Sequence, residues 1–226
     1  MDKGGDLMKK EFVVIGLGRF GGSIVSELIK LDAHVMAIDI SASKVEEFAA
    51  IATQAITADT TDESVLKSLG IQNFEHVIVA IGENIQASIL TTLMLKEIGV
   101  PKITVKAQNS YHEKVLEKIG ADFVVHPERD MGIRIANNMV SNNILDYLEL
   151  SDEHSIAEIK ANAKVVGKTI IDLDIRAKFG INIVAIKRGY EILISPQTIE
   201  EIQRDDILII IGSDVDIHHF EKKLFH

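Results

Sequence analysis

The sequence predicts an α/β protein in which a doubly wound parallel sheet is followed by a smaller α+β domain. Up to about residue 127, six short apolar runs rich in β-branched residues alternate with amphipathic segments. A complete GxGxxG pattern, residues 16–21, directly follows the first run. After residue 151, strand-like runs return in shorter pieces separated by turn residues. Strand–helix alternation is typical of a parallel sheet covered by helices on both faces.

The six apolar runs lack the polar alternation of a half-exposed strand, which indicates strands buried on both faces. Between them, Ile85, Ile89 and Leu93 fall on one face of a predicted helix. Gly70 and Gly120 are placed to end two further helices. The six runs are Phe12–Ile15, Val35–Ile38, Ala55–Ala58, Val77–Ile81, Ile103–Val105 and Phe123–Val125.

The predicted organisation has four parts. Residues 1–9 are polar and Gly-rich and are predicted to be a disordered extension, and residues 10–128 form the nucleotide-binding domain. Residues 129–150 form a long amphipathic segment, interpreted either as crossover and dimerisation helices or as one more helix covering the sheet. Residues 151–226 form a small α+β domain with a helix over Thr169–Lys178 that ends at Gly180. Its strands are predicted at Ile156–Ile159, Ile181–Ile186, Glu191–Ile194 and Ile207–Ile211.

Composition excludes several classes of protein. The net charge of −10 argues against general nucleic-acid binding, which needs clustered Lys and Arg. The absence of cysteine excludes disulfides, thiolate catalysis and sulfur-ligated metals, and the eight histidines show no metal-ligand spacing. The longest stretch without a charge, Asn84 to Leu95, is too short to span a membrane, and no signal peptide is apparent. We therefore expect a cytoplasmic protein.

The glycine pattern lies where dinucleotide-binding chemistry requires it, between a strand and a helix. Gly16 permits a tight turn, Gly18 lets phosphates approach the backbone, and Gly21 allows the helix to pack closely on the strand. The helix that follows offers free N–H groups and the positive end of its dipole to an anion. The first domain is therefore predicted to be a Rossmann-like nucleotide-binding domain.

Two aspartates end the next two strands. Asp39 is placed to accept both ribose hydroxyls and to repel a 2′-phosphate, which disfavours NADP. Asp59 is placed either beside an adenine edge or, with Asp62 as a second candidate, at a helix N-cap.

Arg19 lies inside the glycine loop, where a guanidinium can pair with a terminal phosphate, so ATP and ADP are favoured over NAD. The alternative is that Arg19 points to solvent or pairs with a carboxylate. No Lys–Ser/Thr pair of the Walker A kind follows the loop, and no acid–base pair is placed to support hydride transfer. We therefore expect a binding protein and not an enzyme. The competing hypothesis is an NAD-dependent oxidoreductase fragment or an NAD(H)-sensing regulatory subunit of the Trk type.

The chain from Lys10 to Phe225 resembles the RCK (regulator of potassium conductance) family, in particular its Ktr-type cytosolic subunits. In the first domain the stretches that carry this resemblance are Val14–Gly22, Val77–Gly82, Thr104–Ala107, Gly120–Asp122 and His126–Glu128. In the second domain they are Asp172–Arg176 and Gly180–Gly189.

The resemblance implies an RCK_N Rossmann domain, crossover helices and an RCK_C domain. It further implies homodimers assembled into an octameric ring, which docks from the cytoplasm onto a membrane-embedded K⁺-translocating Ktr subunit. ATP is expected to favour the conducting state and ADP the inactive state. Arg19 would contact the γ-phosphate, Asp39 the ribose, and Glu128 a cation such as Mg²⁺, Ca²⁺ or a monovalent ion. The remaining nucleotide-binding positions implied are Phe20, Ile40, Lys44, Thr60, Ile81, Gly82 and Lys106.

RCK_C domains of this type resemble receptors for cyclic di-AMP, which binds across a two-fold dimer interface. An arginine suits a phosphate, an asparagine a base edge, and isoleucines the adenine faces. Without the resemblance these positions would be assigned to the domain core, which remains the interpretation for Ile171 and Ile183. The matching positions are Ile170, Ile171, Asp174, Ile175, Arg176, Ala177, Asn182, Ile183 and Pro196.

Overall fold

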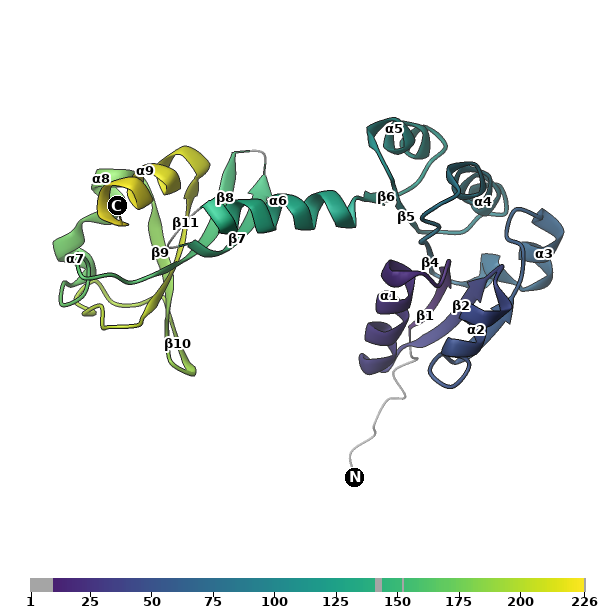
Figure 1. Ribbon diagram of the computed structural model, residues 1–226, viewed down its shortest axis with the longest axis horizontal. Helices are drawn as coiled ribbons and strands as arrows, with labels where there is room; N and C mark the ends of the chain where they lie inside the picture. The colour runs from purple at the N-terminus through teal and green to yellow at the C-terminus, as the bar shows by residue number, and fades with distance from the viewer. Residues whose placement is uncertain (1–9, 141–143, 152, 226) are drawn as a thin grey trace, which may run out of the picture. The chain divides into compact units, whose positions relative to one another are not determined.

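The computed structural model describes residues 10–140, 144–151 and 153–225. The chain forms two compact units, one ending at Pro127 and the other beginning at Glu128. Residues 1–9, predicted to be a disordered extension, lie outside the described residues. Each unit has its own sheet (Figure 1). Each also has its own apolar core.

The first unit is built on a six-stranded parallel sheet with the strand order β3-β2-β1-β4-β5-β6. This confirms the doubly wound α/β prediction. The strands that follow β1 are added first on one side of it, as β2 and β3, and then on the other side, beginning with β4. Ligands of such sheets bind outside the carboxyl ends of the strands at the point where the strand order reverses, here between β1 and β4. The strands are β1 (Glu11–Ile15), β2 (His34–Asp39), β3 (Gln54–Thr57), β4 (His76–Val79), β5 (Ile103–Lys106) and β6 (Phe123–Val125).

Three helices of this unit begin at side chains that cap them. Asp62, Asn84 and Asn109 each accept a hydrogen bond from a backbone N–H of the first turn that follows. The helices are α1 (Arg19–Lys30), α2 (Ala42–Phe48), α3 (Glu63–Ser68), the short 3₁₀ helix η1 (Ile71–Asn73), α4 (Ile85–Glu97) and α5 (Ser110–Lys118).

Apolar clusters cover both faces of the parallel sheet. Neighbouring residues of β1 point to opposite faces: Val14 packs with Val25 of α1 and Val45 of α2. Val13 packs in a second cluster that also contains Leu95 of α4 and Leu116 of α5. Strands buried on both faces explain why the sequence runs are continuously apolar.

Helix α4 buries a face that we did not predict. Its fully buried residues are Ser88, Thr91, Thr92 and Leu95, whereas Leu93 of the predicted stripe is 37% exposed. The buried threonine hydroxyls are paired, since Thr92 Oγ1 donates to the Ser88 carbonyl at 2.7 Å and the Thr91 and Thr60 hydroxyls lie 3.0 Å apart. The buried Ser88 hydroxyl has no partner among the described residues.

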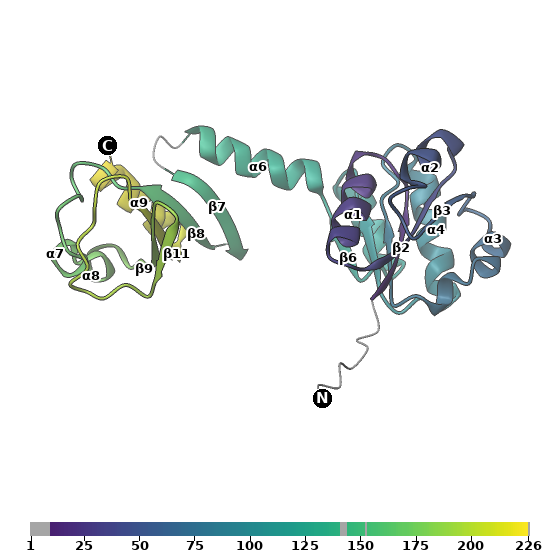
Figure 2. The ribbon, with the colours of Figure 1, turned by 90° about the horizontal axis from the view of Figure 1, so that it is seen from below.

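The second unit contains a five-stranded antiparallel sheet with the order β10-β9-β11-β8-β7. Its core includes Ile159, Ile210, Phe179 and Phe220, so α8 and α9 pack against the sheet (Figure 2). The strands are β7 (Ile144–Ser151), β8 (His154–Lys160), β9 (Asn182–Arg188), β10 (Glu191–Ile194) and β11 (Ile207–Ser213). The helices are α6 (Pro127–Val140), α7 (Ile170–Leu173), α8 (Ile175–Phe179) and α9 (Asp214–Phe225).

The prediction of helices throughout residues 129–150 is wrong for its last part. Helix α6 ends at Val140, and Ile144–Ser151 is strand β7. β7 pairs with β8 in the register Leu148↔Ile156, and Ile144 is buried in the core of the unit. Pairing and burial here outweigh local helical preference.

The helix predicted over Thr169–Lys178 is broken in two. Asp174 separates α7 from α8 with a left-handed backbone at φ +48°. Thr169 and Asp172 form a reciprocal capping box at the start of α7, and Gly180 ends α8 at φ +71° as predicted. No helix in the described part of the chain is long and apolar enough to cross a membrane.

Candidate functional site

The glycine loop joins β1 to α1, and its outer two glycines are required by close contacts. Gly16 has φ +95°, and a Cβ there would lie 2.9 Å from the Ala80 carbonyl carbon. A Cβ at Gly21 would overlap the carbonyl oxygen of Gly16. Both glycines therefore let the start of α1 pack against the ends of β1 and β4.

Gly18 differs because it is not enclosed by protein. A Cβ there would meet no atom within 4 Å, and Gly18 is the N-cap of α1 with no side chain capping the helix. The first N–H groups of α1 are therefore not capped by a side chain, and the space beside Gly18 is open, which suits an anion.

Asp39 ends β2 next to this loop and is 7% exposed. Its Oδ2 accepts the Leu17 N–H at 2.7 Å, its Oδ1 accepts the Ser41 N–H at 2.8 Å, and Lys44 Nζ lies 3.8 Å from Oδ2. Asp39 therefore fixes the glycine loop as well as carrying a carboxylate at the strand end. The sequence reasoning missed Leu17, whose apolar side chain gives no sign of a backbone role. Ile40, the next predicted position, is 69% exposed.

Four predicted positions lie around the ends of β4 and β5. Lys106 Nζ lies 5.8 Å from the centre of the Phe20 ring, and a Cβ at Gly82 would lie 3.8 Å from the same nitrogen. Ile81 packs against the apolar core of the unit. Gln108, which we did not predict, donates its side-chain amide to the Gly82 carbonyl; its position two residues beyond β5 is the signal that could have identified it.

Arg19 is the first residue of α1 and is exposed. Its side chain makes no hydrogen bond or ion pair with another residue in the described ranges, so it does not pair with a carboxylate there.

The structure assigns the helix N-cap role to Asp62, and the adenine-edge role of Asp59 stays a prediction. Asp62 caps α3 by accepting the Ser64 N–H at 2.8 Å. Asp59 is exposed and accepts both the hydroxyl and the N–H of Thr61, and these hydrogen bonds lower the pKa of its carboxyl. The predicted site residue Thr60 is 5% exposed, and its hydroxyl is engaged with Thr91 of α4.

In the second unit, most residues of the predicted cyclic di-AMP set are exposed. Ile171 is 61% exposed, so the core interpretation is wrong for it, whereas Ile183 packs partly against the core as expected. Ile175 is 3% exposed, so its side chain belongs to the core and is unavailable to a ligand. Ile170 packs partly against the core, and Pro196 is half-buried. The exposed remainder is Asp174, Arg176, Ala177 and Asn182.

Glu128 lies exposed in the first turn of α6, where its negative charge interacts favourably with the positive end of the helix dipole. Within the described ranges, no group of three or more His, Asp or Glu side chains is placed to hold a metal ion. One exposed carboxylate does not complete a cation site, so the cation role of Glu128 stays a prediction.

Comparison with known proteins identifies the family. Residues 12–127 match the TrkA-N domain and residues 155–224 the TrkA-C domain. The "Ktr system potassium uptake protein C" of Bacillus subtilis is 68% identical over 219 residues, covering 97% of this chain and 99% of that protein. The chain belongs to the Ktr branch of the RCK family.

The fold agrees with that of a solved channel structure. A structure of the GsuK channel bound to NAD has a TM-score of 0.69 at 16% identity, and it covers 97% of this chain but only 40% of the channel chain. A structure of the KtrA RCK C domain in complex with cyclic diadenosine monophosphate is 59% identical over 32% of this chain and 86% of that chain, with a TM-score of 0.31. The matches to the TrkA-N and TrkA-C domains, together with the Bacillus subtilis relative, confirm the resemblance to the RCK family for both domains.

Proposed function

We propose that this Ktr-family chain is the nucleotide-gated regulatory subunit of a potassium uptake system. It binds ATP or ADP at the carboxyl edge of its parallel sheet and controls K⁺ movement through a membrane-embedded Ktr subunit. The observation that carries this proposal is the open N-terminus of α1 at Gly18, beside the buried carboxylate of Asp39. The helix terminus suits phosphates, and the carboxylate at the end of β2 suits a ribose.

ATP and ADP are favoured over NAD because of Arg19. Its exposed guanidinium, with no partner in the described part of the chain, is available to a terminal phosphate, which ATP and ADP carry and NAD lacks. Asp39 disfavours the 2′-phosphate of NADP by charge repulsion. An NAD(H)-sensing subunit, or a fragment of an NAD-dependent oxidoreductase, would use the same glycine loop and gain nothing from Arg19.

Calorimetry on the full chain with ATP, ADP, NADH and NADP tests this proposal. ATP and ADP should bind in the micromolar range or tighter, and NADP far more weakly. NADH binding well above ATP would instead support the competing hypothesis.

Gating follows from differential affinity. A ligand shifts the equilibrium between two conformations only by the difference in its binding free energy for them. ATP would favour the conducting state and ADP the inactive state without either being consumed, so the subunit is not an enzyme.

The assembly proposed is a homodimer, with dimers forming an octameric ring on the cytoplasmic face of the membrane. Its support is the apolar surface of the second unit. In α6, Met131, Ile135 and Met139 are 50%, 51% and 80% exposed. In β7, Leu148 and Leu150 are 59% and 51% exposed. Apolar surface of this kind is typical of subunit interfaces. Within such a dimer, Mg²⁺, Ca²⁺ or a monovalent cation would be bound by Glu128 of one subunit together with ligands from the second subunit.

Cyclic di-AMP is the ligand proposed for the second unit. Arg176 is exposed, and its side chain makes no hydrogen bond or ion pair with another described residue, so it is available to a phosphate. Ile171 and Asn182 are exposed as well, and they suit an adenine face and a base edge. Two phosphates in a two-fold ligand match two symmetry-related arginines of a dimer.

A further inference from the structure

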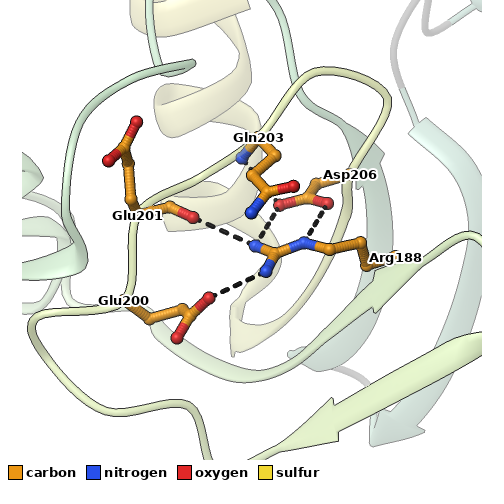
Figure 3. A network of polar contacts seen from close by, with 5 residues as sticks. All are labelled: Arg188, Glu200, Glu201, Gln203 and Asp206. Atoms are coloured by element: carbon orange, nitrogen blue, oxygen red, sulfur yellow. Dashed lines mark hydrogen bonds and ion pairs between the residues drawn. The ribbon is translucent and has the colours of Figure 1, made fainter.

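A second arginine of this unit, Arg188, forms hydrogen bonds and ion pairs with other residues of the same unit. It lies at the end of β9 and is held by three separate residues (Figure 3). Its Nε and Nη2 donate to the two carboxylate oxygens of Asp206, both at 2.9 Å. Its Nη1 donates to Glu200 Oε1 at 2.9 Å, and Nη2 also donates to the Glu201 carbonyl at 3.0 Å.

The buried end of this network is strongly held. Asp206 is fully buried, and its Oδ2 also accepts the Gln203 N–H at 2.8 Å. Bidentate pairing fixes the guanidinium in one orientation. The contacts to Glu200 and Glu201 therefore fasten the segment between β10 and β11 to a rigid point of the sheet.

The same segment supports the start of α7. The Ile171 N–H donates to the Thr198 carbonyl at 2.8 Å, and the Ile170 N–H donates to the Glu200 carbonyl at 3.2 Å. Thr169 and Glu201 form an isolated β-bridge. Pro196 is the second residue of this segment, so the residues that Arg188 holds connect two parts of the proposed cyclic di-AMP site, Pro196 and Ile170–Ile171.

We propose that Arg188 is a positioning residue for the cyclic di-AMP site: through Glu200 and Glu201 it fixes Ile170, Ile171 and Pro196 where the ligand needs them. This inference rests on the proposed function of the second unit. Arg188 touches no ligand in this scheme; Arg176 does.

The sharpest test compares two neighbouring glutamates. Glu200→Ala removes the side-chain contact to Arg188 but leaves the buried Arg188–Asp206 pair intact, so the fold is retained. Glu201→Ala is the matched control, because Glu201 contributes its backbone carbonyl while its carboxylate points away from the guanidinium (Figure 3). Both changes remove one negative charge. Arg188→Lys is a second variant, since one ammonium cannot make the bidentate pair and also reach Glu200.

Two measurements on the full chain decide the matter: calorimetry with cyclic di-AMP and hydrogen exchange of the Ile170 and Ile171 amides. Glu200→Ala should weaken binding about three- to tenfold and speed exchange at both amides, and Arg188→Lys should weaken it about tenfold or more. Glu201→Ala should stay within about 1.5-fold of the wild type, a difference that is small on the free-energy scale. ATP affinity should be unchanged in all three.

Each contrary outcome has a distinct meaning. If the wild type binds cyclic di-AMP and Glu200→Ala equals Glu201→Ala in affinity and exchange, the positioning role is overturned. If the wild type binds no cyclic di-AMP, the proposed function of this unit is wrong and the inference is overturned with it.

Discussion

Replacing Gly18 by Ala should abolish tight nucleotide binding without harming the fold. A Cβ at this position would meet no atom within 4 Å, and the φ of −74° and ψ of −170° are accessible to Ala. Ala restricts the unfolded chain more than Gly, which stabilises the fold by about 0.4–1 kcal/mol. Ala is also a poorer N-cap residue than Gly, which costs about the same, so stability should change little. The methyl group would occupy the space that phosphates enter above α1. Losing one charge-assisted hydrogen bond there costs about 1.5–3 kcal/mol, which is an affinity loss of about 10- to 150-fold.

Gly21→Ala is the matched comparison. Its Cβ would overlap the Gly16 carbonyl oxygen and lie 3.0 Å from the Ala80 Cβ, and such overpacking costs about 1–3 kcal/mol or more. Thermal unfolding without nucleotide and calorimetry with ATP separate the two effects. Gly18→Ala should unfold close to the wild-type temperature and bind weakly, whereas Gly21→Ala should unfold at a clearly lower temperature. Wild-type ATP affinity in Gly18→Ala would refute the assignment of the loop to phosphate.

Four further predictions follow from the same structure. Arg19→Ala should weaken ATP more than ADP in calorimetry, since only ATP has a third phosphate; equal losses would remove Arg19 from the γ-phosphate role. In vesicles holding the membrane Ktr subunit, a non-hydrolysable ATP analogue should support K⁺ flux about as well as ATP, and a strict need for hydrolysis would contradict gating by affinity. Arg176→Ala should lower cyclic di-AMP affinity by about two orders of magnitude or more, because two symmetry-related contacts are lost, while ATP affinity stays at the wild-type value. Burial, and then His126, lower the pKa of His112 below its ordinary value of 6.5; the folded state thus disfavours the protonated form, so stability should be full above pH 6.5 and fall as the pH drops below it. His112→Asn should flatten that loss in urea titrations, and an unchanged slope would exclude His112 as its source.

The parallel sheet was predictable because its signal is local. Each strand is a short β-branched run, and burial on both faces leaves no competing pattern. The glycine loop could be placed for the same reason, since its spacing and its position after β1 both lie within a few residues.

The errors arose where distant parts of the chain decide the structure. Strand β7 depends on pairing with β8, and a segment rich in leucine carries no local mark of that pairing. The buried face of α4 contains Ser88 and Thr91, which burial patterns based on apolar residues overlook; Thr60, far away in sequence, supplies the hydroxyl partner.

The candidate sites show the same division. Asp39 was identified from its position at the end of a strand. The hydrogen bond that it accepts from the Leu17 N–H could not be predicted, because the donor is a backbone group and the Leu17 side chain gives no sign of it. Ile175 and Ile171 look alike in sequence, yet the break at Asp174 leaves one buried and the other exposed. The kind of contact that a side chain can make could be predicted from its residue type. Which of the two isoleucines is exposed depends on the backbone turn at Asp174, which the sequence did not indicate.

The central claim is that the first domain binds ATP or ADP as a gating ligand. Mass spectrometry of the nucleotide released from the purified full chain tests it most directly. The structure and the position of Arg19 predict ATP or ADP in the released fraction, and Gly18→Ala should release little or none. NAD or NADH as the dominant released species would contradict the claim.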